Sequence, residues 1–164
     1  METEQELVQV KGLRYPSIEV PKVAERYFTV ARELLAQQAN KGNMEAYLQL
    51  ACSEDPSVNL ISWYKGNELV GILLYSVGYT WWTDRAWVFE EGVIAMRDDV
   101  HGIQRKAMEA LDTIAEEADA MGIAAGNLLS THDTMVANGY MKHGGYDRQY
   151  SSFVKFRKVV DTNA

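Results

Sequence analysis

The chain has 164 residues, of which 47% are hydrophobic and 24% charged, which is sufficient for one hydrophobic core and predicts a single domain over residues 1–164. The formal net charge of −7 and the lack of any block of lysines and arginines exclude a nucleic-acid partner held mainly through its phosphates. The one cysteine, Cys52, excludes an intrachain disulfide and a cysteine-rich metal site, and it favours a reducing, cytoplasmic location.

The first sixteen residues are predicted to be an irregular N-terminal extension, and their acidic, polar character predicts neither a signal peptide nor a membrane partner. Apolar residues at three- and four-residue spacing then predict an amphipathic helix that begins near Pro21 and ends before Gly42. A second, shorter helix is predicted from Asn43, as its N-cap residue, to Cys52.

The next segment, VNLISWYKGNELVGILLYSV, predicts a β-hairpin that turns at Gly66 and Asn67, residue types that tolerate positive φ. A third strand is predicted over RAWVFEEGVIAM, with apolar residues on both faces and therefore a central place in the sheet. Strict alternation puts Trp87, Phe89, Val93 and Ala95 on one face of this strand and Val88, Ile94 and Met96 on the other.

A helical pattern follows from Ile103 to Met121 and is predicted to stop at Gly122. IAAGNLLS predicts a short strand, Ser130 or Thr131 a helix N-cap, GGY the end of that helix, and QYSSFVKFRKVV a final strand. The order α-α-β-β-β-α-β-α-β, with one strand–helix–strand crossover, indicates an α/β (α+β) domain with a mixed sheet.

This order, the junction EGVIAMRDDVHGIQRKAMEALDTIAEEADAMG and the closing NGYMKHGGYDRQYSSFVKF resemble the GNAT superfamily of acyl-CoA N-acyltransferases. The resemblance implies a mixed, mostly antiparallel central sheet flanked by helices. It also implies acetyl-CoA or a related acyl-CoA as donor, a small-molecule or protein amine as acceptor, and direct transfer without a covalent intermediate.

The family's cofactor loop reads Arg/Gln-x-x-Gly-x-Gly/Ala, and its backbone amides at a helix N-terminus hold the CoA pyrophosphate. Two registers are open: Asp99, Gly102 and Gln104, or His101, Gln104 and Lys106, on the three signature positions. The cofactor-binding residues implied are Ile94, Ala95, Met96, His101, Gly102, Ile103, Gln104, Arg105 and Lys106.

Two aspartates in this junction, Asp98 and Asp99, bring negative charge toward the diphosphate. Each close like-charge contact costs about 4 kcal/mol at ~4 Å and an effective dielectric near 20, before screening. His101, Arg105 and Lys106 offset part of this repulsion with long or titratable cationic side chains. We therefore expect weak acetyl-CoA binding, with a Kd of about 100 μM or above.

Acyl transfer to an amine needs a base, and the resemblance implies a carboxylate on the strand before the loop. Glu90 and Glu91 lie there on opposite faces, although a solvated pair of glutamates is also open. In the family, a tyrosine protonates the leaving thiolate, and its position corresponds to Met141 in this sequence. Tyr140 lies one residue earlier. His132 is a further titratable candidate.

A pair of tryptophans, Trp81 and Trp82, lies in the loop between two predicted strands. They could line an acceptor pocket, anchor a protein partner or pack in the core. No spacing among the three histidines predicts a metal site.

Two functions follow. The first is a cytoplasmic GNAT-type N-acetyltransferase. The alternative is a catalytically silent GNAT-fold interaction or assembly protein, such as a homo-oligomer or a virion-associated component of a phage-like particle. The departures from the loop signature favour this alternative.

Overall fold

The computed structural model describes residues 6–31, 40–54, 58–125 and 139–147. The elements, in chain order, are β1 (Val8–Lys11), α1 (Pro16–Ala31), α2 (Lys41–Ala51), β2 (Asn59–Lys65), β3 (Glu68–Tyr79), β4 (Ala86–Ala95), α3 (Ile103–Glu117) and β5 (Gly122–Ala124). Residues 139–143 form a further piece of helix. Within this part of the chain the strand order is β1-β2-β3-β4-β5, antiparallel up to β4 and parallel between β4 and β5.

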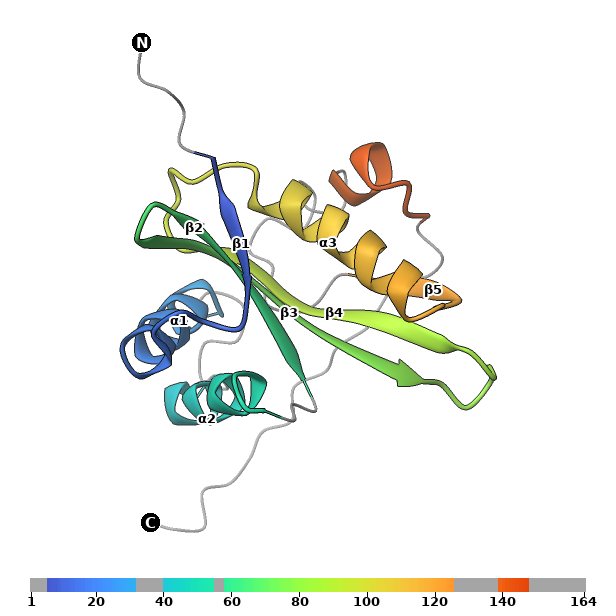
Figure 1. Cartoon of the computed structure of the whole chain (residues 1–164), viewed down its shortest axis with the longest axis horizontal. Coiled ribbons are helices and arrows are strands. Elements are labelled where there is room, and N and C mark those ends of the chain that lie inside the picture. The colour runs from blue at the N-terminus through green and yellow to red at the C-terminus, as the bar shows by residue number, and fades with distance from the viewer. Residues whose placement is uncertain (1–5, 32–39, 55–57, 126–138, 148–164) are drawn as a thin grey trace, which may run out of the picture.

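Helices cover both faces of the sheet, with α1 and α2 on one side and α3 crossing the other (Figure 1). This arrangement confirms the predicted fold class, a mixed and mostly antiparallel sheet flanked by helices. None of the helices in the described ranges is long and apolar enough to cross a membrane.

Strand β1 lies within the segment that the sequence predicted to be irregular, and that prediction is wrong for Val8–Lys11. The strand pairs with β2 in the register Val10↔Ser62, and the Ser62 hydroxyl donates to the Gly12 carbonyl just beyond it (2.5 Å). Four residues of edge strand carry too little local pattern to be recognised, because the pairing partner lies some fifty residues away along the chain.

The helix boundaries also differ from the prediction. Helix α1 begins at Pro16, five residues before Pro21, which lies inside the helix. The Glu19 carboxylate accepts hydrogen bonds from the Tyr15 amide (2.7 Å) and the Tyr64 hydroxyl (2.7 Å), which fixes this earlier start against the sheet. Gly42 does not end this helix as predicted, because it belongs to α2.

The N-cap of α2 is Asn40 and not Asn43. Its side-chain oxygen accepts a hydrogen bond from the Asn43 amide (3.0 Å), so the residue predicted to be the cap is the donor to it. Both asparagines fit the local signal, and the choice between them depends on where the chain enters the helix.

Replacing Asn40 by alanine is expected to lower the free energy of unfolding by about 1 kcal/mol, since one amide at the start of α2 loses its acceptor. Asn43→Ala removes a side chain that makes no cap and is the matched control. Chemical denaturation of both variants measures the difference; equal losses would contradict the assignment of Asn40 as the cap.

The hairpin between β2 and β3 confirms the sequence prediction. Gly66 has φ 61°, and Lys65 pairs with Glu68 across the turn. The Arg14 guanidinium donates to the Gly66 carbonyl (3.0 Å), which ties the segment before α1 to this turn.

Two hydrophobic clusters fill the two faces of the sheet. The cluster under α1 and α2 contains Val20, Val23, Ala24, Tyr27, Leu48, Leu60, Ile72, Leu74 and Ile94, among others. The cluster under α3 contains Trp63, Leu73, Tyr75, Val88, Ile103, Ala107, Ala110 and Leu111, among others.

A β-bulge interrupts β4. Leu74 pairs with Gly92 and Tyr75 with Glu90, so Glu91 has no partner on β3. The extra residue reverses the alternation of side chains beyond it, and Val88 therefore packs under α3 while Ile94 packs under α1 and α2. The predicted common face for Val88, Ile94 and Met96 is wrong for this reason.

Helix α3 ends at Glu117, four residues before Met121, the last residue of the predicted pattern. Asp119, with φ 49°, turns the chain out of the helix, and Gly122 is the first residue of β5. A Cβ placed on Gly122 would lie 2.7 Å from the Trp87 ring, so this glycine allows β5 to pack against β4.

Candidate active site

Strands β4 and β5 are paired over three residues, from Trp87↔Gly122 to Phe89↔Ala124, in the part of β5 that the structure describes. We call the region of β4 that follows, from Glu90 to Ala95, the fork. The Met96 amide donates to Val70 of β3 (2.9 Å), so the amide and carbonyl of the preceding Ala95 point away from β3. The fork thus presents backbone polar groups on the side opposite β3.

Glu90 is the first residue of the fork and one of the few buried charged residues, with 6% of its surface exposed. Because it pairs with Tyr75, its side chain leaves the sheet on the α3 face. Burial and then the Glu90 charge raise the pKa of Tyr140 and of Tyr27 well above the usual value for a tyrosine. Both phenols therefore stay protonated at neutral pH, and the Glu90 charge acts on each of them.

Glu91 is the bulged residue and is exposed. Its carboxylate accepts a hydrogen bond from the Ser76 hydroxyl (2.9 Å), and its charge adds to burial in raising the pKa of Tyr47 on α2. The two adjacent glutamates thus lie in different environments, one enclosed by tyrosines and one open to solvent on the side of α2.

The side chain of Tyr140 points inward. Counting back from the Gly-aromatic turn had instead placed the family's tyrosine at Met141. Tyr140 is 7% exposed and packs on Tyr146, with ring centroids 4.9 Å apart, whereas Met141 is 40% exposed. Gly145, with φ 70°, ends the helix as predicted and lets the Tyr146 amide donate back to the Tyr140 carbonyl (3.2 Å).

The raised pKa values define what these tyrosines can do. Burial, and after it the charges of Asp112 and Glu90, raise the pKa of Tyr146 to about 12, and that of Tyr140 is raised further by burial and by Glu90. Both phenols therefore stay protonated at neutral pH, and the role of Tyr140 as acid for the thiolate stays a prediction.

Tyr27 of α1 was missed by sequence reasoning, which counted it as a core residue of an amphipathic helix. It is 2% exposed, and its hydroxyl has no hydrogen-bond partner within the described ranges. A Cβ placed on Gly92, in the fork, would lie 3.0 Å from this oxygen. The sequence did hold a signal for this residue, namely one phenol among otherwise apolar residues on one face of the predicted helix.

The loop after β4 leads into the N-terminus of α3. Gly102 is its N-cap residue, with φ 87° and no side-chain cap, and the first helical hydrogen bond runs from the Lys106 amide to the Gly102 carbonyl (3.1 Å). The amides of residues 102–105 therefore have no intrahelical acceptor. His101, Gly102 and Arg105 are exposed beside them, which leaves amides and cationic side chains at one place.

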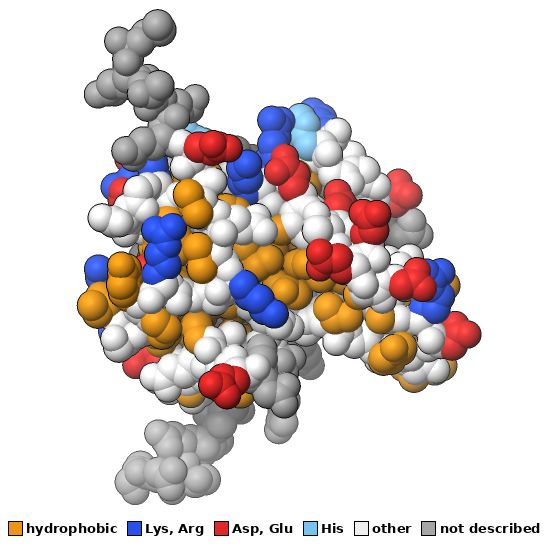
Figure 2. All heavy atoms as spheres, viewed as in Figure 1, with side chains coloured by type: hydrophobic (Ala, Val, Ile, Leu, Met, Phe, Trp, Pro, Cys, Tyr) orange, Lys and Arg blue, Asp and Glu red, His pale blue; other side chains and the backbone are white. Residues whose placement is uncertain are grey.

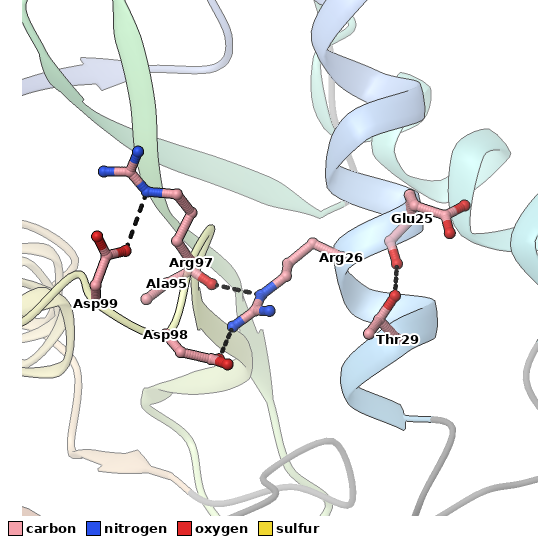
Figure 3. A network of polar contacts seen from close by, with 7 residues as sticks. All are labelled: Glu25, Arg26, Thr29, Ala95, Arg97, Asp98 and Asp99. Carbon is pink, nitrogen blue, oxygen red and sulfur yellow. Dashed lines mark hydrogen bonds and ion pairs between the residues drawn. The ribbon is translucent and has the colours of Figure 1, made fainter.

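The two aspartates of this loop are ion-paired (Figure 3). Arg26 of α1 donates to Asp98 (2.8 Å) and to the Ala95 carbonyl (2.9 Å), and Arg97 contacts both Asp99 (3.1 Å) and Glu68 (2.7 Å). These ion pairs compensate part of the repulsion between the aspartates and the diphosphate that the sequence predicted. The compensation is small, because exposed ion pairs contribute little. Arg26 is 72 residues from Asp98 along the chain, so no local pattern could have shown this contact.

Other residues predicted to bind cofactor have side chains that are buried or that pack against neighbouring elements. The side chains of Ile94 and Ile103 are buried in the two cores, and Met96 packs partly against the first of them. Gln104 lies against the 139–143 helix, because a Cβ on Gly139 would be 2.6 Å from its side-chain oxygen. His132 lies outside the described residues.

The two tryptophans are not beside Glu90. Trp81 is 92% and Trp82 63% exposed, in an edge-to-face pair with centroids 5.7 Å apart. They lie in the turn beyond the Tyr79↔Ala86 pair, and four strand residues, about 13 Å, separate Ala86 from Glu90. Packing of these tryptophans in the core is therefore wrong, whereas an acceptor pocket or a contact with a protein partner stays a prediction.

Solved structures share this architecture over almost the whole chain. A possible acetyltransferase from Clostridium difficile 630 superposes with a TM-score of 0.70 at 9% sequence identity, covering 94% of this chain and 99% of the other. The ribosomal-protein-alanine N-acetyltransferase of Brucella melitensis biovar Abortus 2308 gives 0.67 at 14% identity, covering 93% and 100%.

The chain has the GNAT fold. The aminoglycoside N-acetyltransferase AAC(6')-Iy, solved in complex with CoA, is a further GNAT-fold neighbour, with a TM-score of 0.65, 12% identity and coverage of 96% and 99%. No family model matches the sequence, and no curated protein sequence matches it, so the likeness is one of GNAT architecture at low identity.

Proposed function

We propose that this protein is an acyl-CoA-dependent N-acyltransferase that transfers an acyl group, such as acetyl, directly to an amine. The observation that carries the proposal is the buried Glu90 carboxylate on β4, whose charge acts on the Tyr140 and Tyr27 phenols, ahead of the loop that leads into the N-terminus of α3. The structural neighbours include acetyltransferases for amine substrates and one in complex with CoA, which supports the reaction class.

The residues present suit a CoA thioester. The amides at the N-terminus of α3, which have no intrahelical acceptor, would offer donors to a pyrophosphate, and His101, Arg105 and Lys106 nearby would offer positive charge. The Ala95 amide, which points away from β3, would donate to a carbonyl of an extended pantetheine chain, whereas the Ala95 carbonyl already accepts from Arg26. When bound, the thioester supplies an activated acyl carbonyl.

The remaining chemistry belongs to side chains of the fork. Glu90 would accept a proton from the incoming ammonium, which frees the amine lone pair for attack. The Tyr27 hydroxyl, buried and without a partner in the described chain, would donate to the acyl oxygen or accept from the amine. The packed rings of Tyr140 and Tyr146 and the burial of Glu90 would limit the access of water that competes with the amine.

A calorimetric titration with acetyl-CoA tests the donor site. We expect a Kd of about 100 μM, because the loop holds one glycine but its aspartates are ion-paired. Gly102→Ala is expected to weaken binding roughly tenfold, since a side chain at φ 87° strains the loop by about 1–2 kcal/mol.

Gly12→Ala is the matched control, because Gly12 has a similar φ of 77° and equally open surroundings but lies far from this loop. It should carry the same backbone strain and leave acetyl-CoA affinity unchanged. No binding at millimolar acetyl-CoA would reject the proposal and favour a catalytically silent interaction protein.

A further inference from the structure

An arginine of α1 reaches the edge of β4 at the end of the fork. The Arg26 Nε–H donates to the Ala95 carbonyl (2.9 Å), and an Nη2–H donates to Asp98 in the loop that follows (2.8 Å). Because the Ala95 carbonyl points away from β3, the guanidinium lies at the edge of the sheet on the fork side (Figure 3). The Arg26 side chain is 21% exposed. Helix α1 therefore holds a permanent positive charge at this edge.

The start of α3 reaches the same place from the other face of the sheet. Ile103, the first residue of α3, packs so closely on Gly71 that a Cβ on this glycine would overlap three of its side-chain carbons. Gly71 is the partner of Ala95 across the β3–β4 ladder. Directly opposite residues of an antiparallel pair lie about 5 Å apart. Arg26 and the first turn of α3 therefore approach β4 at the same pair of residues, from opposite faces.

Positive charge near this point is valuable for a polyanionic cofactor. The chain has a formal net charge of −7, and Figure 2 shows acidic side chains along α3. The loop itself adds Asp98 and Asp99. A CoA diphosphate would thus be held against the field of the whole molecule, so each cation close to the amides at the start of α3 affects its affinity.

Asp98 is a weak partner for Arg26. Its side chain is 96% exposed, and water competes for both charges of such a pair. A diphosphate offers several charged oxygens, which a guanidinium binds through two parallel N–H donors. The Ala95 carbonyl engages the Nε–H and orients the guanidinium, so its Nη groups would reach a phosphate without a further loss of side-chain freedom.

We propose that Arg26 is a further cofactor-binding residue, whose guanidinium exchanges Asp98 for the diphosphate of a bound acyl-CoA. The proposal rests on the acyltransferase function proposed above. In this exchange Asp98 competes with the phosphates for the same donors. Loss of the Asp98 charge should therefore favour the cofactor most where Arg26 is present.

The test is calorimetry with acetyl-CoA on the full chain, on two single variants and on their double variant. Arg26→Gln should weaken binding roughly tenfold, because a charge-assisted contact to phosphate is lost. Asp98→Asn should strengthen binding about threefold, the effect of one exposed ion pair. In the Arg26→Gln background the gain from Asp98→Asn should be clearly smaller. A gain of equal size in both backgrounds would show that Asp98 acts by repulsion alone and would overturn the exchange.

Arg85→Gln and Asp119→Asn are the matched controls. Arg85 lies just before β4 and makes the same two kinds of contact, to the exposed Asp119 carboxylate (2.7 Å) and to the Asp119 backbone carbonyl (3.1 Å). The ten residues of β4, about 30 Å, separate it from the Arg26 contact. Acetyl-CoA affinity should stay the same in both controls. Equal weakening in Arg26→Gln and Arg85→Gln would reflect net charge alone and would overturn the proposal.

A second ligand identifies the phosphate concerned. Acetyl-dephospho-CoA keeps the diphosphate and lacks the 3′-phosphate, so Arg26→Gln should weaken its binding by the same factor. An effect confined to acetyl-CoA would place Arg26 on the 3′-phosphate and contradict the proposal.

The unaltered chain separates this proposal from the function on which it rests. Absence of acetyl-CoA binding at millimolar concentration would reject the acyltransferase function itself. Binding that Arg26→Gln leaves unchanged would reject the role of Arg26 alone.

Discussion

Replacing Glu90 by glutamine is expected to lower the rate of acyl transfer by roughly 10²–10⁴-fold, while Glu91→Gln leaves it nearly unchanged. Glutamine keeps the shape and hydrogen bonding of glutamate but has no basic oxygen. The asymmetry rests on the bulge, which leaves Glu90 enclosed at the fork and turns Glu91 to solvent beside Ser76. Steady-state assays with acetyl-CoA and a panel of primary amines measure it.

Two further measurements distinguish a catalytic base from a residue with only a structural role. The fall in rate at acid pH, which reports protonation of the base, should vanish in Glu90→Gln alone. Acetyl-CoA affinity should be the same in both variants, because neither residue lies in the loop before α3. Small and equal losses of rate in the two variants would reject a carboxylate base on β4 and direct attention to His132.

Gly71→Ala is expected to lower the free energy of unfolding by about 1–3 kcal/mol, which for a chain of this size is a fall in Tm of roughly 2–4 °C per kcal/mol. A Cβ at Gly71 would lie 2.4–2.8 Å from three carbon atoms of Ile103, the buried first residue of α3. The helix start must move or the Ile103 side chain must leave its place.

Gly78→Ala is the control on the same strand, because a Cβ there meets no atom within 4 Å. It should leave the Tm unchanged or raise it slightly through the unfolded state. Since α3 carries the amides of the proposed cofactor site at its start, Gly71→Ala should also weaken acetyl-CoA binding. Thermal unfolding curves that coincide for the two variants would show that the Ile103 side chain moves aside without loss of stability.

Local patterns predicted those elements whose signal lies within a few residues. The β2–β3 hairpin is an example, since Gly66 and the apolar runs on both sides of it are contiguous. The helix starts were less certain because the signals are duplicated: Pro16 and Pro21, or Asn40 and Asn43, suit the same positions. Contacts from distant residues, such as Tyr64 to Glu19, decide between them.

The site was predicted in part. The position of Glu90 before the loop and the glycine at 102 follow from the strand-to-helix junction. The inward turn of Tyr140, the unpartnered hydroxyl of Tyr27 and the pairing of Asp98 with Arg26 do not, because each depends on an element that is far away in sequence. The electrostatic argument from the loop left out the ion pairs of Asp98 with Arg26 and of Asp99 with Arg97.

The bulge at Glu91 has a consequence for how the length of β4 can vary. Side chains alternate between the two faces of the sheet along β4, and the bulge reverses this alternation. Deletion of Glu91 would therefore move the side chains of half the strand to the opposite face. Removing or adding two residues would preserve the phase. Homologous chains that keep both the Val88 and the Ile94 contacts should therefore differ in the length of this strand by even numbers only.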